Sequence, residues 1–182
     1  MKGIIFNLLE EVTVEALGEA GWDRALEAAD SAGTYTSVGN YPDEELVRLL
    51  SAAAGAIGIP ADDHLTWFGH HALGKLAQTY SSFFEPHRSA RDLVLTLNDV
   101  IHPEVRKIYP GADVPDFEFE EGTDGALVVG YRSARRMCRF AQGLIQGAAA
   151  YYGEDAIVEH IECMNRGDER CLMRCSFTPR GG

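Results

Sequence analysis

Two groups of side chains in this sequence have the residue types and spacing that metal or ligand binding requires. The first includes His102, which lies among apolar residues within residues 97–105. A neutral imidazole in such surroundings can bind a metal ion through one ring nitrogen. A buried histidine is also common in protein cores, where hydrogen bonds alone satisfy it. The spacing of residues leaves both interpretations open.

The same group includes Tyr131, Ser133 and Arg135, which follow a short apolar stretch. We expect them at the junction of a strand and a helix, where Ser133 is a plausible N-cap. A phenol, a hydroxyl and a guanidinium there could converge on a carboxylate or a phosphate, with which arginine forms a bidentate pair. By spacing alone, the run could equally be a helix cap followed by an exposed arginine.

The second group consists of Cys138, His160, Cys163 and Cys171. Three sulfur atoms and one imidazole form a complete tetrahedral ligand set for a structural zinc ion. His160 would point away from Cys163 in a regular strand, so the site requires a bulge or twist between them. The alternative is that the cysteines are buried apolar residues and that the histidine lies on the surface.

The remaining cysteine and the remaining histidines carry weaker signals. Cys175 lies about 13 Å from Cys171 along a strand that rises roughly 3.3 Å per residue, too far to share one ion. We therefore leave Cys175 out of the ligand set. His64 is expected in a polar loop, without the partners that a site needs.

Apolar periodicity predicts the elements that must position these groups. Residues 1–100 show the helical spacing of apolar side chains. After Pro110 and Gly111 the pattern changes to that of short strands. The expected order is strands at residues 117–119 and 126–131, a helix over 134–151, and a hairpin with strands near 156–163 and 170–178. The predicted fold class is α+β, an N-terminal helical subdomain followed by an antiparallel sheet with one inserted helix.

Length and composition limit the class of protein. The 182 residues suit one domain over residues 1–182, and 46% hydrophobic against 24% charged residues can build a core. The net charge of -12 argues against nucleic acid and anionic membranes as partners. No apolar run is long enough to span a membrane, and acidic residues follow the start too soon for a signal peptide. We therefore expect a cytoplasmic protein whose cysteines stay reduced.

Motifs of catalysis are missing from the sequence. It contains no glycine-rich nucleotide loop, no nucleophile elbow and no H-E-x-x-H zinc motif. Its adjacent acidic pairs do not face each other on a helix or strand, and we expect them on the solvated surface. The sequence therefore predicts a binding protein rather than an enzyme.

Several segments together resemble a known family. They are residues 1–11, 41–46, 67–69 and 97–105, with Pro115 and the Y-x-S-x-R run at residues 131–135. Over essentially the whole chain, the sequence resembles the H-NOX family, haem domains that bind nitric oxide or oxygen, in its stand-alone bacterial form. The histidine and the Y-x-S-x-R run are specific in combination, whereas either alone is a weak signal.

The resemblance implies a haem b cofactor and a role for each residue of the first group. His102 would be the proximal iron ligand. Tyr131, Ser133 and Arg135 would hold the haem propionates, and Pro115 would press on the porphyrin and distort it. The chemistry is consistent, because propionates are carboxylates and one imidazole leaves the other face of the iron open to a diatomic gas.

The resemblance also predicts which gas is bound. Family members that hold oxygen stably donate a hydrogen bond to it from a tyrosine, and the corresponding position here is Phe140, which has no donor. Leu144, Ile5 and Leu9 would add apolar walls. We therefore expect a ferrous protein that binds nitric oxide and carbon monoxide and excludes oxygen.

Further expectations concern zinc, partners and rival functions. Some family members resemble the Cys138, His160, Cys163 and Cys171 arrangement and carry a structural zinc. In the family, the signal commonly passes to a separate histidine kinase or cyclic-di-GMP enzyme. One rival function is a redox sensor that uses the zinc ligands and their thiols. The other is a haem-free module that binds a small ligand.

Overall fold

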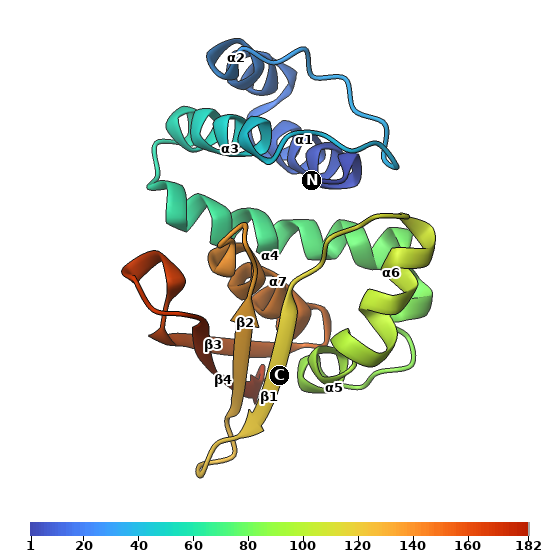
Figure 1. Ribbon diagram of the computed structural model, residues 1–182, viewed down its shortest axis with the longest axis vertical. Helices are drawn as coiled ribbons and strands as arrows, with labels where there is room; N and C mark the ends of the chain where they lie inside the picture. The colour runs from blue at the N-terminus through green and yellow to red at the C-terminus, as the bar shows by residue number, and fades with distance from the viewer. Residues whose placement is uncertain (182) are drawn as a thin grey trace.

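The computed structural model describes residues 1–181 and has a helical N-terminal part above a mixed part (Figure 1). The helices of the first part and the long helix beneath them are α1 (Gly3–Leu17), α2 (Glu19–Ala29), α3 (Asp43–Ile57) and α4 (Ala61–Thr79). The remaining elements are η1 (Ser81–Phe83), α5 (Ala90–Leu95), η2 (Leu97–Ile101), α6 (His102–Ile108), β1 (Asp116–Glu121), β2 (Leu127–Arg132), α7 (Cys138–Tyr151), β3 (Glu154–Glu162), η3 (Met164–Arg166) and β4 (Cys171–Pro179).

The N-terminal helices form because their apolar residues recur with the helical period and share one core. Phe6 and Leu9 of α1, Leu49 of α3 and Phe68 of α4 are fully buried in this core. The acidic residues of the first turn of α3 favour its start, because negative charge stabilises a helix N-terminus. The helix ends at Gly58, whose positive φ of 81° suits glycine.

The mixed part contains one antiparallel sheet with strand order β1-β2-β4-β3. Its apolar face packs with α7 in a second core that includes Val129, Ile145 and Met173. A register shift separates His160 from Glu162 where β3 pairs with β4. The predicted zinc site required an irregularity in this segment, but with this register shift His160 still lies outside the cysteine cluster.

Helices α4 and α7 cross closely and join the two parts (Figure 1). Three glycines permit the approach. A Cβ atom on Gly143 would lie 2.0 Å from the Thr66 carbonyl oxygen, and one on Gly69 would lie 2.4 Å from the Phe140 carbonyl oxygen. Gly147 is similarly close to the His70 carbonyl. Any larger residue would push the two helix backbones apart.

The predicted α+β class and the element order are confirmed, while two local details differ. The helix α7 begins at Cys138 rather than at residue 134, so Ser133 is not its N-cap. Instead the Ser133 hydroxyl accepts a hydrogen bond from the Arg135 backbone at 3.3 Å. Within residues 1–181, none of the helices is both long and apolar enough to cross a membrane.

Candidate functional site

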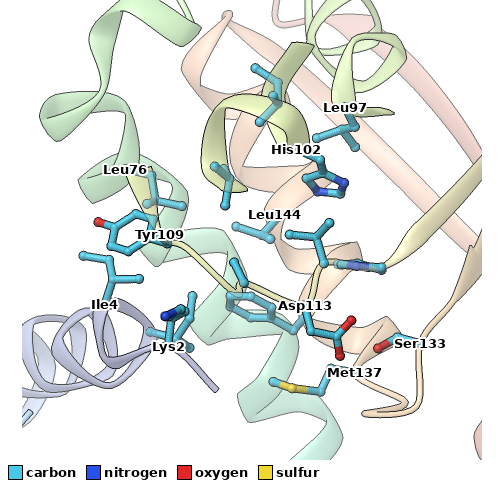
Figure 2. Close-up of a pocket in the computed structure, with 18 of the residues that line it drawn as sticks. Lys2, Ile4, Leu76, Leu97, His102, Tyr109, Asp113, Ser133, Met137 and Leu144 are labelled. Carbon is cyan, nitrogen blue, oxygen red and sulfur yellow. The ribbon is translucent and has the colours of Figure 1, made fainter. Parts of the chain in front are cut away.

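A cavity of about 330 Å³ lies where the two parts meet (Figure 2). Its walls come from α1, α4, α6 and α7 and from the segment between α6 and β1. Apolar side chains form most of the lining, and a few polar groups gather at one edge. A concave, mainly apolar space with few convergent polar groups is typical of a cofactor or small-molecule site.

His102 lines this cavity as the first residue of α6. Burial lowers the pKa of its imidazole to about 4, Arg106 adds to the shift and Asp116 opposes it. The ring is therefore neutral at pH 7, with a nitrogen lone pair available to a metal ion. Its nearest aromatic neighbour is Phe117, whose ring centre is 5.6 Å away.

Two hydroxyl groups stand at the polar edge of the cavity. Tyr131 lies on β2 and is almost wholly buried. Its hydroxyl accepts a hydrogen bond from the Met137 backbone N–H at 3.2 Å. Burial raises the pKa of Tyr131 to about 12, so the phenol keeps its proton. The Ser133 hydroxyl likewise accepts a backbone N–H and retains its own proton. Both groups can therefore donate to an anionic ligand.

Arg135 completes this edge and links it to the N-terminal helices. Its Nε lies 2.8 Å from Asp43 and its Nη1 lies 2.9 Å from Asp113. Asp43 also receives the Met1 ammonium group at 2.5 Å. Burial alone would raise the pKa of Asp43, but Met1 and Arg135 outweigh it and hold the pKa below its usual value. A carboxylate ligand at this edge would meet an arginine that is already held in place.

The apolar walls match the predicted residues with one exception. Ile5, Pro115, Phe140 and Leu144 all line the cavity. Leu9 does not belong to the lining and is instead fully buried in the core of the N-terminal helices. The reason is helical geometry, because residues four apart share nearly one face of α1 but lie about 6 Å apart along its axis, so Ile5 reaches the cavity and Leu9 lies one turn further along, in the core.

Sequence reasoning missed two phenols that line the same cavity. Tyr80 follows the end of α4, and Tyr109 follows the end of α6. Their hydroxyl groups form a hydrogen bond with each other. No sequence spacing connects them, and the only available signal was an aromatic residue at the end of each helical pattern.

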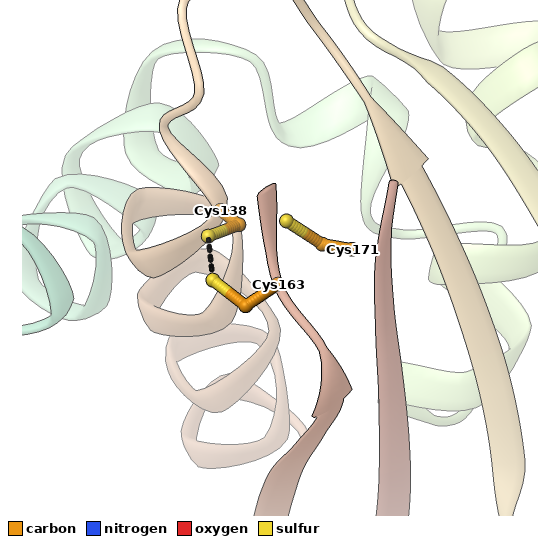
Figure 3. A group of neighbouring side chains, drawn as sticks. All are labelled: Cys138, Cys163 and Cys171. Carbon is orange, nitrogen blue, oxygen red and sulfur yellow. Dashed lines mark hydrogen bonds between the residues drawn. The ribbon is translucent and has the colours of Figure 1, made fainter. Parts of the chain in front are cut away.

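Three of the four predicted zinc ligands meet between α7 and the sheet (Figure 3). The sulfur atoms of Cys138, Cys163 and Cys171 all lie within 4.8 Å of one another, and all three side chains are buried. Cys138 and Cys163 are 3.7 Å apart, sulfur to sulfur. The Met164 backbone N–H donates to Cys171, and the Asn165 side-chain amide donates to Cys138.

Burial raises the pKa of Cys138 and of Cys171, and of the three thiols only Cys163 is shifted towards the thiolate. Burial alone would raise the pKa of Cys163, but the backbone N–H groups of Asn165 and Arg166 and the neighbouring thiols outweigh it and lower the pKa. A thiolate is the form that binds metal ions.

The fourth predicted ligand lies apart from the sulfurs. His160 donates or accepts a hydrogen bond with Gln142 through Nε2 at 3.0 Å. Its Nδ1 is buried and, within residues 1–181, has no hydrogen-bond partner. Cys175 is also outside the cluster, and burial raises its pKa to about 12. The separation of Cys175 from the cluster agrees with the strand geometry.

The cavity fits a haem group in its chemistry. An apolar space suits a porphyrin, a neutral imidazole on its wall suits iron, and hydroxyl and guanidinium groups on one edge suit propionates. The same cavity contains the apolar lining, the imidazole of His102 and the hydroxyl and guanidinium groups at its edge.

Comparisons with known proteins support the same assignment. The family model described as Haem-NO-binding matches residues 2–160. Among curated protein sequences, no significant match was found.

Solved structures give close matches. The chain is 30% identical to an H-NOX protein from S. oneidensis in the Fe(II)NO ligation state, with TM-score 0.90 over 98% of this chain and 99% of that one. An NMR structure of a Shewanella oneidensis H-NOX domain in the Fe(II)CO state is 30% identical, with TM-score 0.88 and the same coverage. Unliganded Fe(II) H-NOX from K. algicida is 26% identical, with TM-score 0.86 over 99% and 98% of the two chains. The chain therefore belongs to the haem-NO-binding family, and the solved structures that it resembles include H-NOX proteins.

Proposed function

We propose that this protein is a haem-based sensor of nitric oxide that also binds carbon monoxide and excludes oxygen. Its family consists of haem-based gas sensors. The observation that carries the proposal is the neutral His102 in the wall of an apolar cavity whose edge presents Tyr131, Ser133 and Arg135. When bound, a ferrous haem would supply an iron atom with one axial position open to a diatomic gas.

Each residue of the cavity has a definite task in this proposal. His102 offers its ring nitrogen to the iron. Tyr131 and Ser133 donate hydrogen bonds to the propionates, and Arg135 adds a positive charge while Asp43 and Asp113 hold it in place. Pro115 lines the cavity as a rigid apolar contact.

Selectivity against oxygen is supported by three apolar side chains on the cavity wall. Ile5, Phe140 and Leu144 have no hydrogen-bonding side chain, and donors beside the gas are what favour oxygen in haem pockets. Two of the S. oneidensis structures are in the Fe(II)NO and Fe(II)CO ligation states, so an H-NOX protein similar to this chain accommodates both gases.

The first experiment is an absorption spectrum of the purified, dithionite-reduced protein before and after nitric oxide is added. We expect a Soret band that shifts with nitric oxide and does not form a stable oxygenated spectrum in air. A His102→Ala variant should lose haem or regain it with added imidazole. The absence of a Soret band after expression with added haem would refute the proposal, and a stable spectrum of the oxygen complex would refute the selectivity.

We infer that the signal passes to a separate protein, either a histidine kinase or a cyclic-di-GMP enzyme. The support is the strongly acidic chain, with its net charge of -12, which can meet a basic surface. Measuring the activity of a candidate partner with the protein in its reduced form, with and without nitric oxide, tests this inference. Equal activity in both states for every candidate would oppose it.

The cysteine cluster supports a second proposal, a structural zinc held by Cys138, Cys163 and Cys171 with His160 as the fourth ligand. Three buried sulfurs that receive N–H donors are suited to a metal ion. The unpartnered Nδ1 of His160 is the nitrogen that a rotation of the ring could bring to the ion.

Metal analysis tests the zinc proposal. We expect about one zinc per chain in the native protein, loss of zinc in Cys171→Ser, and retention in the matched control Cys175→Ser, since a closed site needs its ligands. Release of zinc by peroxide, with loss of partner control in haem-free protein, would favour the thiol redox sensor instead. Native protein without zinc would refute the site.

A further inference from the structure

The segment that carries His102 has one buried side chain to hold it. Between residues 95 and 125, all of which the structure describes, Tyr109 is the single fully buried residue, 7% exposed. Neither η2 nor α6 contains a buried residue. Burial of apolar surface is what normally fixes a helix to its neighbours. Leu97 and Ile101 of η2 pack half-buried against the cores, so Tyr109 is the buried anchor at the other end of the segment, directly after α6.

Tyr109 is connected to the central helix of the fold. Its hydroxyl forms a hydrogen bond with that of Tyr80, directly after the last residue of α4. The Tyr80 ring stacks on Phe83, with ring centres 6.1 Å apart. Because α4 crosses α7 at glycine contacts, it provides a rigid reference.

Tyr109 directly follows α6, and His102 is the first residue of that helix. The two residues are seven apart, about two helical turns, so they lie near the same side of α6. Both line the same cavity. A displacement of Tyr109 would therefore move His102 along or across that cavity.

The other end of the segment is pliable. The turn η2 is a π-helix in which the Thr96 carbonyl accepts hydrogen bonds from both Val100, at 2.9 Å, and Ile101, at 3.1 Å. Pro103 has no backbone N–H to donate to a carbonyl of the preceding turn. A π-helical turn contains one residue more than an α-helical turn, and its hydrogen bonds can shift between the two patterns. The turn can therefore act as a hinge.

We propose that the phenol pair, Tyr80 and Tyr109, positions His102 by fixing the end of α6 against α4. The pliable η2 turn permits movement of α6, and the hydrogen bond between the phenols selects one position. The inference rests on the proposed haem function, because the position of His102 has a consequence only when the imidazole binds iron.

The test uses Tyr109→Phe, Tyr80→Phe and the double variant in the haem-loaded, reduced protein. Tyr35→Phe is the matched control, since its phenol bonds to Glu45 and Ser31 away from the cavity. We expect amide hydrogen exchange across residues 97–109 to accelerate by roughly 2- to 10-fold, the effect of one lost hydrogen bond. We also expect a shifted iron–histidine stretching band in resonance Raman spectra.

The double variant should behave like either single variant, because both remove the same hydrogen bond. The control should change neither measurement. Exchange and stretching bands in the Tyr80 and Tyr109 variants that match the wild type would overturn the inference and leave the haem proposal intact. A wild-type protein without a Soret band would instead overturn the haem proposal and, with it, this role of the phenols.

Discussion

At the scale of single residues, the protein keeps several histidines neutral by burial. His64 is an example outside the cavity, because it is fully buried on α4 and stacks on Trp67 with ring centres 5.5 Å apart. The expectation that it lies in a polar loop is wrong. The helix α4 begins at Ala61, so its first turn carries His64 inward to the core.

His64 predicts a specific loss of stability in mild acid. Burial lowers its pKa from 6.5 to about 4, so the unfolded chain takes up a proton that the folded chain refuses. Stability is unaffected above the unfolded pKa and falls as the pH drops below it, by about 2 kcal/mol between pH 7 and pH 5. Urea denaturation of the wild type and of His64→Leu at both pH values measures this. The His64→Leu variant should lack this fall in the free energy of unfolding between pH 7 and pH 5. The same fall in the variant as in the wild type would contradict the prediction.

The ion pairs of Asp43 predict a smaller effect on stability, and here the charged form of the side chain is the one that stabilises the fold. Asp43→Asn removes the contacts with Met1 and Arg135 and should destabilise the protein at pH 7 by at most about 1 kcal/mol, since Asp43 is 42% exposed and solvent screens it. The pKa of Asp43 is lowered in the fold, so its contribution is present above the usual value of 3.8 and disappears as the carboxylate protonates below it.

Denaturation of Asp43→Asn beside Asp113→Asn at pH 7 and pH 3 checks this expectation. The Asp113 variant is the control, because Asp113 contacts Arg135 but not the N-terminus. A difference between Asp43→Asn and the wild type that is as large at pH 3 as at pH 7 would show that the charge is not responsible.

At the scale of elements, the crossing of α4 and α7 holds the N-terminal helices to the sheet. The crossing depends on glycine at positions where one backbone meets another. The cavity has Phe140 and Leu144 of α7 on its wall, beside these contacts. A change in the crossing would therefore change the shape of the cavity.

Two glycine substitutions separate close packing from helix propensity. Gly143→Ala should destabilise the protein by about 1–3 kcal/mol, because the new Cβ would meet the Thr66 carbonyl oxygen at 2.0 Å. Gly74→Ala is the matched control on α4, where a Cβ has no neighbour within 4 Å, and should stabilise by roughly 0.5–1 kcal/mol. Thermal denaturation of the two variants measures both effects. If Gly143→Ala and Gly74→Ala changed the stability in the same direction and by the same amount, the crossing of α4 and α7 would not be tightly packed.

At the scale of the whole molecule, the cavity connects both parts of the fold. Residues of α1, α4, α6 and α7 contribute to one lining, and the Asp43 to Arg135 contact joins the N-terminal part to the polar edge. A ligand in the cavity would therefore contact both the N-terminal helices and the mixed part of the fold.

Haem loading should consequently raise the stability of the entire chain. A ligand that binds only the folded state stabilises it by about 4 kcal/mol when present at about 1,000 times its dissociation constant. We expect a higher Tm in the haem-loaded protein than in the haem-free protein, and a smaller gain in Arg135→Gln, which lacks the positive charge at the polar edge. Calorimetry of both proteins with and without haem provides the comparison. An equal gain in Arg135→Gln would exclude Arg135 from binding.

The sequence by itself determined the fold class, the order of elements and most of the candidate site. Apolar periodicity depends on local geometry, so it identified the helices and strands, and the resemblance brought His102 together with Tyr131, Ser133 and Arg135. Only the tertiary structure showed that Leu9 belongs to the core, that Ser133 is not a helix cap, and that His160 lies apart from the three sulfurs. Tyr80 and Tyr109 likewise meet only through the packing of α6 beside α4. Contacts between residues distant in the chain depend on helix rotation and on one-residue shifts, which local patterns do not specify.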